Sequence, residues 1–164
     1  MAVMNVTDGS KVILTVIDVA GGGLANLHPS TGTNGLVIPT IQDVTLNATP
    51  GTVRYSTLDS SASSAFTTVN ENSLSLNLLV DDDVYFGDGS NSTNSVANKG
   101  LLGSSISKDE VYFSLTFEGT GSGANYVTGK AFIGGLAPSS SIDQAVFISP
   151  VELIINGEIT KSTV

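Results

Sequence analysis

The chain has 164 residues, of which 40% are hydrophobic and 13% are charged, and 15 Asp and Glu against 6 Lys and Arg give a formal net charge of −9. Because general nucleic-acid binding depends on Lys and Arg that neutralise phosphates, this balance argues against a nucleic-acid-binding protein. The lack of cysteine excludes a disulfide framework, a thiolate nucleophile and a zinc site built from Cys.

Residues 1–164 are expected to form one soluble domain, because a chain of this length can bury a single hydrophobic core. The N-terminal residues lack the basic start and apolar stretch of a signal peptide. No later apolar run approaches the roughly 18 residues that a membrane helix needs. We therefore expect a protein made in the cytoplasm, with no membrane partner.

Strand-like runs dominate the chain, and clusters of Gly, Ser, Asn, Asp and Pro separate them. The runs are residues 12–17, 36–41, 44–46, 53–55, 74–80, 111–117, 126–133 and 146–155. Apolar side chains take every second position at Leu74, Leu76, Leu78 and Val80, and the same period recurs in residues 111–117. This pattern predicts a mainly β fold, an antiparallel β-sandwich or partly closed barrel with one packed and one polar face.

One short helix and two long loops complete the expected fold. The helix covers residues 94–102, where Asn94 or Ser95 can cap the start, although Gly100 disfavours it. The loops are residues 20–35 and 56–72, and unstructured stretches of this length in a compact domain usually serve a function.

Catalytic machinery is not evident in the sequence. The single histidine, His28, stands in a Gly- and Ser-rich stretch and is best interpreted as a surface residue. Asp109 and Glu110 are adjacent in a strand and so point to opposite faces, which argues against a catalytic carboxylate pair. Gly119, Gly121 and Gly123 lie between two strand-like runs and indicate a hairpin connection, not a phosphate-binding loop. We predict no enzyme activity and no cofactor.

The densest group of oxygen ligands is formed by Asp81, Asp83 and Asp88, and calcium binds clustered carboxylates of this kind. The spacing does not fit the EF-hand loop. A solvated strand end followed by a turn is therefore the favoured interpretation. A weak calcium site and a charged contact between subunits are the alternatives.

The second half of the chain resembles the major tail tube protein of long-tailed, siphovirus-like bacteriophages. In that family a strand, a short helix, a strand-turn-strand pair and a final strand with a Gly-containing tag follow one another. The matching segments here are residues 73–83, 95–102, 111–117 and 151–160, the last ending in Gly157-Glu158-Ile159-Thr160. Residues 20–35 have no counterpart in the family.

The resemblance implies a structural virion protein of the phage tail, assembled in the host cytoplasm into stacked, hexameric rings. The rings form a tube through which genome DNA leaves without specific binding, and an acidic wall suits that passage. Its other partners would be the tail terminator, the tape measure protein and, around a contractile tail, a sheath. In the family a long loop between early strands reaches the neighbouring ring, and residues 53–72 match it here.

The candidate inter-subunit contacts are Arg54, Asp59, Glu71 and Glu158, all polar residues in or near segments that match the family. A capsid decoration or fibre protein shares the acidic, β-rich, cysteine-free profile. A calcium-dependent carbohydrate-binding β-sandwich module is an alternative of a different class. Unpaired strand edges favour self-association in any of these settings.

Overall fold

The computed structural model describes residues 12–18, 35–38, 41–55, 64–88, 96–117, 123–140 and 146–163. Its elements in chain order are β1 (Ile13–Asp18), β2 (Leu36–Ile38), β3 (Ile41–Tyr55), β4 (Ser64–Leu79), α1 (Asp82–Phe86), α2 (Val96–Ser107), β5 (Glu110–Thr116), β6 (Asn125–Gly134), β7 (Ile148–Ile155) and β8 (Thr160–Thr163). Strands dominate these residues, and the predicted mainly β class is confirmed.

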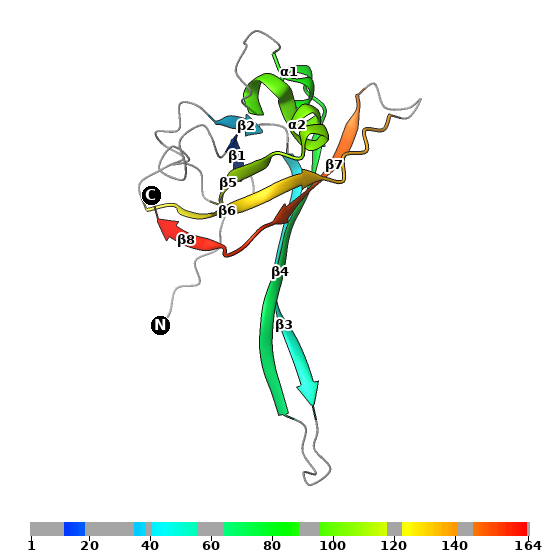
Figure 1. Ribbon diagram of the computed structural model, residues 1–164. Coiled ribbons are helices and arrows are strands. Elements are labelled where there is room, and N and C mark those ends of the chain that lie inside the picture. Colours follow the sequence, from blue (N-terminus) through cyan, green and yellow to red (C-terminus); the bar gives the residue numbers. More distant parts are fainter. Residues whose placement is uncertain are drawn as a thin grey trace.

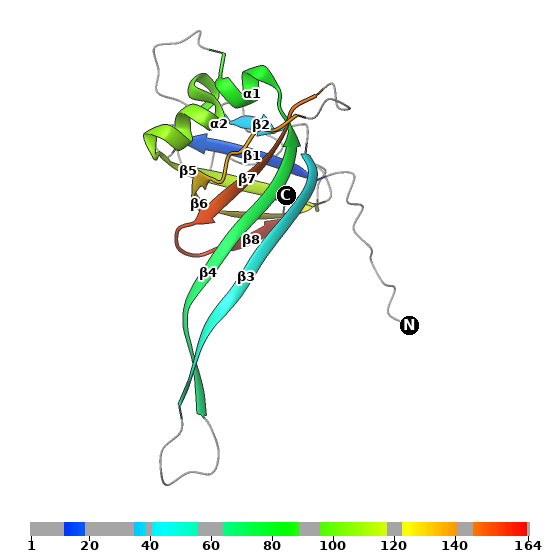
Figure 2. The same cartoon turned by 90° about the vertical axis from the view of Figure 1, so that its right-hand side faces the viewer.

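All strands join one antiparallel sheet in the order β2-β1-β5-β6-β7-β4-β3, and β8 pairs with β6. The end strands β2 and β3 do not pair with each other, so the sheet does not close. The sheet bends, and β1 and β5 cross the direction of β3 and β4 (Figure 2). Leu14 of β1 and Leu76 of β4 consequently belong to the same buried cluster, as in a sandwich.

The core follows the alternation that the sequence predicts. Leu74, Leu76 and Leu78 are buried in β4, and Phe113 is fully buried in β5. Opposite Phe113 in the ladder stands Gly129 of β6. A Cβ at that position would lie 2.9 Å from the Phe113 ring, so the glycine provides the space that the ring occupies.

The chain after β7 continues along the same edge of β6. Ala131 pairs with Ile155, and Thr128 pairs with Thr160. Between these pairs the amide of Asn156 donates to the carbonyl of Lys130 at 2.7 Å. The expected Gly-containing tag therefore leads directly into β8. Through β8, the N-terminal part of β6 is paired as well.

Helix α1 begins at the aspartate cluster, where the sequence had favoured a strand end and turn. Asp81 is the N-cap, and its Oδ1 accepts a hydrogen bond from the amide of Val84 at 3.3 Å. Asp82 and Asp83 lie in the first turn, where a carboxylate interacts favourably with the helix dipole. The same three aspartates thus start a helix that was not predicted.

Helix α2 confirms the predicted helix but extends further, to Ser107. Gly100 interrupts it with a φ of 66°, which agrees with the expectation that this glycine disfavours a regular helix. A Cβ on Gly100 would lie 2.5 Å from the amide nitrogen of Gly87 and from the carbonyl oxygen of Tyr85. The two helices are therefore in backbone contact at this point.

No helix within the described ranges is both long enough and apolar enough to span a membrane.

Candidate assembly surfaces

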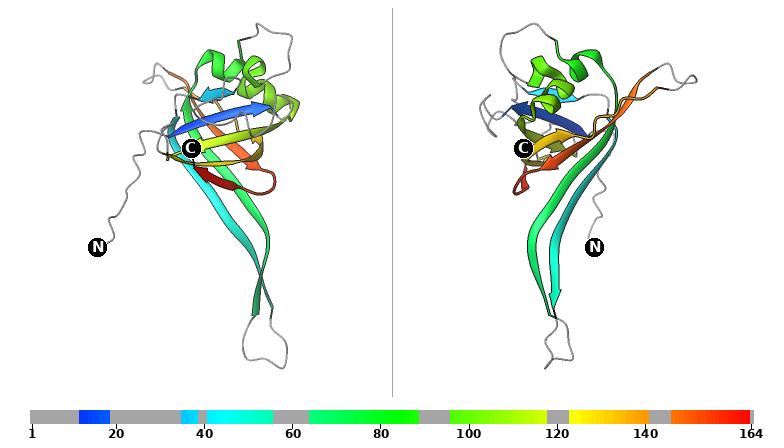
Figure 3. Two further views of the ribbon diagram at one scale, coloured as in Figure 1. Left: turned by 90° about the vertical axis from the view of Figure 1, so that its left-hand side faces the viewer. Right: turned by 45° about the vertical axis from the view of Figure 1, so that its right-hand side comes forward.

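Strands β3 and β4 form a long hairpin whose outer part projects away from the rest of the structure (Figures 1 and 3). We call that rest the body, and it comprises helices α1 and α2 and the paired strands, including the inner parts of β3 and β4. The loop expected over residues 56–72 is wrong for residues 64–72, because these belong to β4. Thr and Val are frequent in strands. Hydrogen bonds to β3 satisfy the backbone groups of this segment, so it can form a strand although its sequence shows no apolar alternation. The expected loop of residues 20–35 lies outside the described residues, apart from Gly35.

An irregularity divides the hairpin into two parts. Thr49 pairs with Glu71, but Gly51 pairs with Thr68, so the register shifts around Pro50. Proline has no amide hydrogen to donate to a ladder and is tolerated at such bulges. We call the part beyond the shift, residues 51–55 and 64–68, the distal hairpin.

The distal hairpin exposes apolar side chains. Tyr55 and Phe66 are 52% and 53% exposed, and their ring centroids lie 6.0 Å apart. Val53, which pairs with Phe66, is exposed as well. Within the described residues this segment pairs only as β3 with β4, so nothing in the body covers these side chains.

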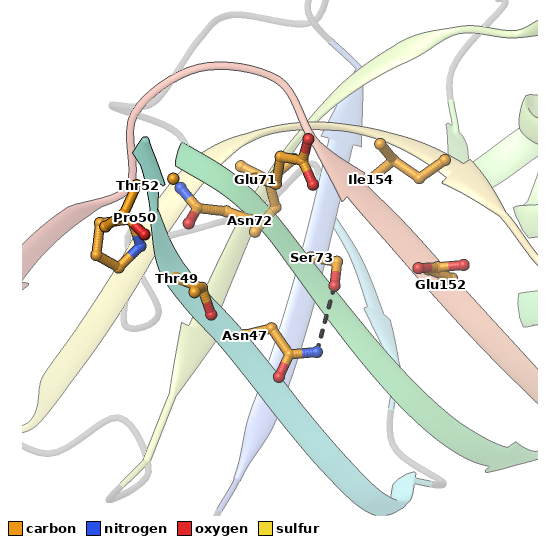
Figure 4. A pocket seen from close by; sticks show the side chains of 11 residues that line it. Asn47, Thr49, Pro50, Thr52, Glu71, Asn72, Ser73, Glu152 and Ile154 are labelled. Atoms are coloured by element: carbon orange, nitrogen blue, oxygen red, sulfur yellow. Dashed lines mark hydrogen bonds between the residues drawn. The ribbon is translucent and has the colours of Figure 1, made fainter. Parts of the chain in front are cut away.

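A groove opens where the hairpin separates from β7. The last pair between β4 and β7 is Ser73 with Ile154, after which β7 follows β6 while β4 continues outward. Figure 4 shows the side chains around this groove, which we call the base groove. Its lining residues are Asn47, Thr49, Pro50, Gly51, Thr52, Glu71, Asn72, Ser73, Glu152, Ile154 and Ile155.

The base groove combines acidic and apolar groups. Glu71 and Glu152 are its charged residues, and Ile154 is 53% exposed. Asn72 is only 8% exposed, and its Oδ1 has no hydrogen-bond donor within the described residues. This oxygen has less than 1 Å² of accessible surface, so it is not a group that an occupant of the groove would contact.

Two of the six Lys and Arg residues of the chain form ion pairs on the body. Lys99 Nζ lies 2.6 Å from Asp109 Oδ2. Lys130 Nζ lies 3.5 Å from Glu110 Oε2 and 5.3 Å from the centroid of the Tyr112 ring. The adjacent carboxylates thus pair with separate lysines, although Asp109 lies just before β5 and not within a strand as the sequence had suggested.

Three of the four predicted contact residues lie around the hairpin. Arg54 is exposed on the distal hairpin, and Glu71 lines the base groove. Glu158 lines a second cleft at the hairpin base, together with Ala48, Pro50, Asn72 and Ile159, and this cleft shares Pro50 and Asn72 with the base groove. Asp59 lies outside the described residues. Their role as contacts stays a prediction.

The aspartates predicted as a weak calcium site have a structural role in part. Asp81 caps α1, Asp83 lies in its first turn, and Asp88 is exposed just after Gly87. In the described ranges, no three His, Cys, Asp or Glu side chains gather in a way that could hold a metal ion. The calcium hypothesis stays a prediction, and His28 lies outside the described residues.

Sequence reasoning missed Glu152, Ile154 and the exposed aromatic residues of the distal hairpin. A signal for Ile154 was present, because it stands on the polar side of the alternation in β7, between the buried Leu153 and Ile155. No comparable signal existed for Tyr55 and Phe66, since their exposure depends on where the hairpin leaves the body.

Comparison with known proteins gives matches only at the level of structure. No protein-family model matches the chain, and no curated protein matches it. A chain in the tail of an empty gene transfer agent (GTA) particle, determined with C6 symmetry, superposes with a TM-score of 0.65 and 12% identity. The match covers 96% of this chain and 99% of that chain.

The chain has the fold of a GTA tail subunit. A chain in the virion of the native GTA particle matches with a TM-score of 0.59, again at 12% identity and with the same coverage. At this identity the likeness concerns the fold. It confirms the resemblance to a phage-like tail protein that the sequence suggested, and it extends over 96% of this chain.

Proposed function

We propose that this chain is a structural subunit of a phage-like tail, which assembles with copies of itself into stacked hexameric rings that form the tail tube. The observation that carries the proposal is the nearly end-to-end fold match to a subunit of a GTA tail that has C6 symmetry. We assign the chain a structural role in the virion and no catalytic role.

The shape of the subunit supports stacking. The distal hairpin projects beyond the body and presents apolar side chains that a second copy could cover (Figure 1). Contact between the hairpin of one copy and a different surface of the next is heterologous, so it can repeat along an axis. Stacked rings are one arrangement that repeats in this way.

The charge of the subunit supports a conduit for DNA. A ring of six copies would carry a formal charge of −54, six times −9. The ion pairs of Lys99 and Lys130 leave still less positive charge for phosphates. A wall of this sign repels a duplex and lets it slide during ejection. Other tail proteins, namely a terminator, a tape measure and in contractile tails a sheath, are the further partners.

Negative-stain electron microscopy of the concentrated protein tests the proposal. We expect rings or tubes whose pore admits a DNA duplex. Added salt should promote rings and tubes, because it screens the electrostatic repulsion between acidic subunits. The Debye length is about 10 Å at 0.1 M salt. Monomers at every salt and protein concentration would contradict the proposal. Compact trimers would instead favour a decoration or fibre protein, and stabilisation by calcium and sugar would favour a carbohydrate-binding module.

A further inference from the structure

We infer that the base groove is the receptor for the distal hairpin of a second copy, and that Arg54 of that hairpin is held beside Glu71. The inference rests on the proposed function, since it names the partner that the groove and the hairpin recognise in the stacked assembly. It adds a specific pair of surfaces and a charge contact between them.

The charges of the two surfaces are complementary. The described residues that line the base groove include Glu71 and Glu152, and no Lys or Arg is among them. Arg54 is exposed on the distal hairpin, and no ion pair of Arg54 is found within the described residues. The guanidinium group carries five N–H donors in a planar fork that suits a carboxylate.

The uncharged parts of the surfaces also match. Ile154 offers exposed apolar area in the groove, and Tyr55 and Phe66 offer it on the hairpin. A central apolar contact beside a charged group is typical of protein interfaces.

The geometry requires the hairpin to come from another copy. Arg54 lies five residues beyond Thr49, the residue that pairs with Glu71. At about 3.3 Å per residue, this places the backbone of Arg54 roughly 16 Å from that of its own Glu71 along an extended strand. A second copy, displaced along the hairpin, is the direct way to bring the two side chains together.

Charge reversal in trans tests the inference. We expect Arg54→Glu and Glu71→Arg each to raise the protein concentration needed for tubes at least tenfold, since each places like charges in contact. An equimolar mixture of the two variants should assemble again. In the mixture, the hairpin of each variant can contact the groove of the other variant. Every such contact then joins a glutamate to an arginine. The Arg54→Glu, Glu71→Arg double variant should also assemble.

Two controls carry the same charge changes elsewhere. Lys161→Glu in β8 matches Arg54→Glu in sign, and Asp82→Arg in α1 matches Glu71→Arg, and both positions are exposed. We expect less than a twofold change from either. Circular dichroism should give closely similar melting temperatures for the other variants, because their exchanged side chains are on the surface, and a slightly lower one for Asp82→Arg, which removes a favourable carboxylate from the first turn of α1.

Each failure points to a different conclusion. If the wild-type chain forms tubes but Arg54→Glu forms them equally well, the groove inference is wrong and the proposed function stands. Controls as defective as the groove variants would also overturn the inference, because net charge would then explain the loss. Recovery in the double variant without recovery in the mixture would place the contact within one chain. A wild-type chain that never assembles refutes the proposed function itself.

Discussion

The body and the distal hairpin are stabilised in different ways, although both are antiparallel β-structure. In the body, side chains such as Phe113 and Leu76 are buried against several strands at once. In the distal hairpin, Tyr55 and Phe66 contact each other and are otherwise half exposed. The body therefore has its packing partners within the chain, whereas the hairpin lacks them among the described residues.

This difference separates folding from assembly. An isolated two-stranded hairpin is at best marginally stable in water, and three or more strands or an added packing surface are normally required. A hairpin that keeps apolar groups exposed gains from a partner that covers them. Changes in the body should therefore lower the free energy of unfolding, and changes in the hairpin should affect association.

The largest effect is expected in the body, from Phe113→Ala. The ring is fully buried and fills the space above Gly129. Loss of a buried Phe side chain should lower the free energy of unfolding by about 3 to 5 kcal/mol. Urea denaturation of the monomer measures this loss. Phe113→Leu, which keeps much of the apolar volume, should lose clearly less, and equal losses would show that the cavity is not the cause.

The contact between α1 and α2 should produce the second largest effect. In Gly100→Ala, the new Cβ meets the backbone of Tyr85 and Gly87 at 2.5 Å, and φ is 66°. Gly157→Ala is a matched control, because Gly157 also has a positive φ, 96°, but nothing within the described residues lies within 4 Å of the added Cβ. Each variant should lose roughly 1 to 3 kcal/mol for its backbone conformation.

The additional loss of stability in Gly100→Ala, relative to Gly157→Ala, measures the steric cost of the close approach between α1 and α2. We expect thermal denaturation to place the Gly100→Ala variant below Gly157→Ala in melting temperature. Equal melting temperatures would mean that α1 moves away without loss of stability, and the two helices would then not act as one packed unit.

Much of the body could be predicted from the sequence, because burial there follows a period of two. The apolar positions of β4 and β5 correctly predicted their core faces. The hairpin was predicted only in part, because residues 53–55 were identified as strand-like and lie in β3, whereas residues 47–52 and 64–72 show no such period and were not predicted as strand. Helix α1 was missed because its start, Asp81 to Asp83, also has the composition of a turn.

The base groove depends on contacts that no local pattern encodes. It exists because β7 stops pairing with β4 at Ser73 and continues along β6. Glu71 and Arg54 were predicted as contact residues from their polarity and position, but nothing in the sequence indicated that they pair with each other. The inferred pairing rests on the length of the hairpin and on the lack of cations among the described residues that line the groove.

The smallest effect on folding is expected from Phe66→Thr in the distal hairpin. Threonine keeps the preference for strand structure, and the ring is 53% exposed, so the free energy of unfolding should change by at most about 0.5 kcal/mol. The same change should raise the concentration needed for tubes at least fivefold, because it removes apolar area that a second copy would cover. Light scattering and electron microscopy measure this threshold.

Phe147→Thr separates a specific hairpin contact from general surface hydrophobicity. Phe147 is 57% exposed and lies just before β7, and its backbone carbonyl, which accepts from the amide of Val80, is unaffected by the substitution. If assembly depends on the hairpin, Phe147→Thr should leave the threshold nearly unchanged while Phe66→Thr raises it. Equal shifts would indicate that any exposed aromatic residue promotes association, and the distinction between a self-sufficient body and a partner-dependent hairpin would then fail.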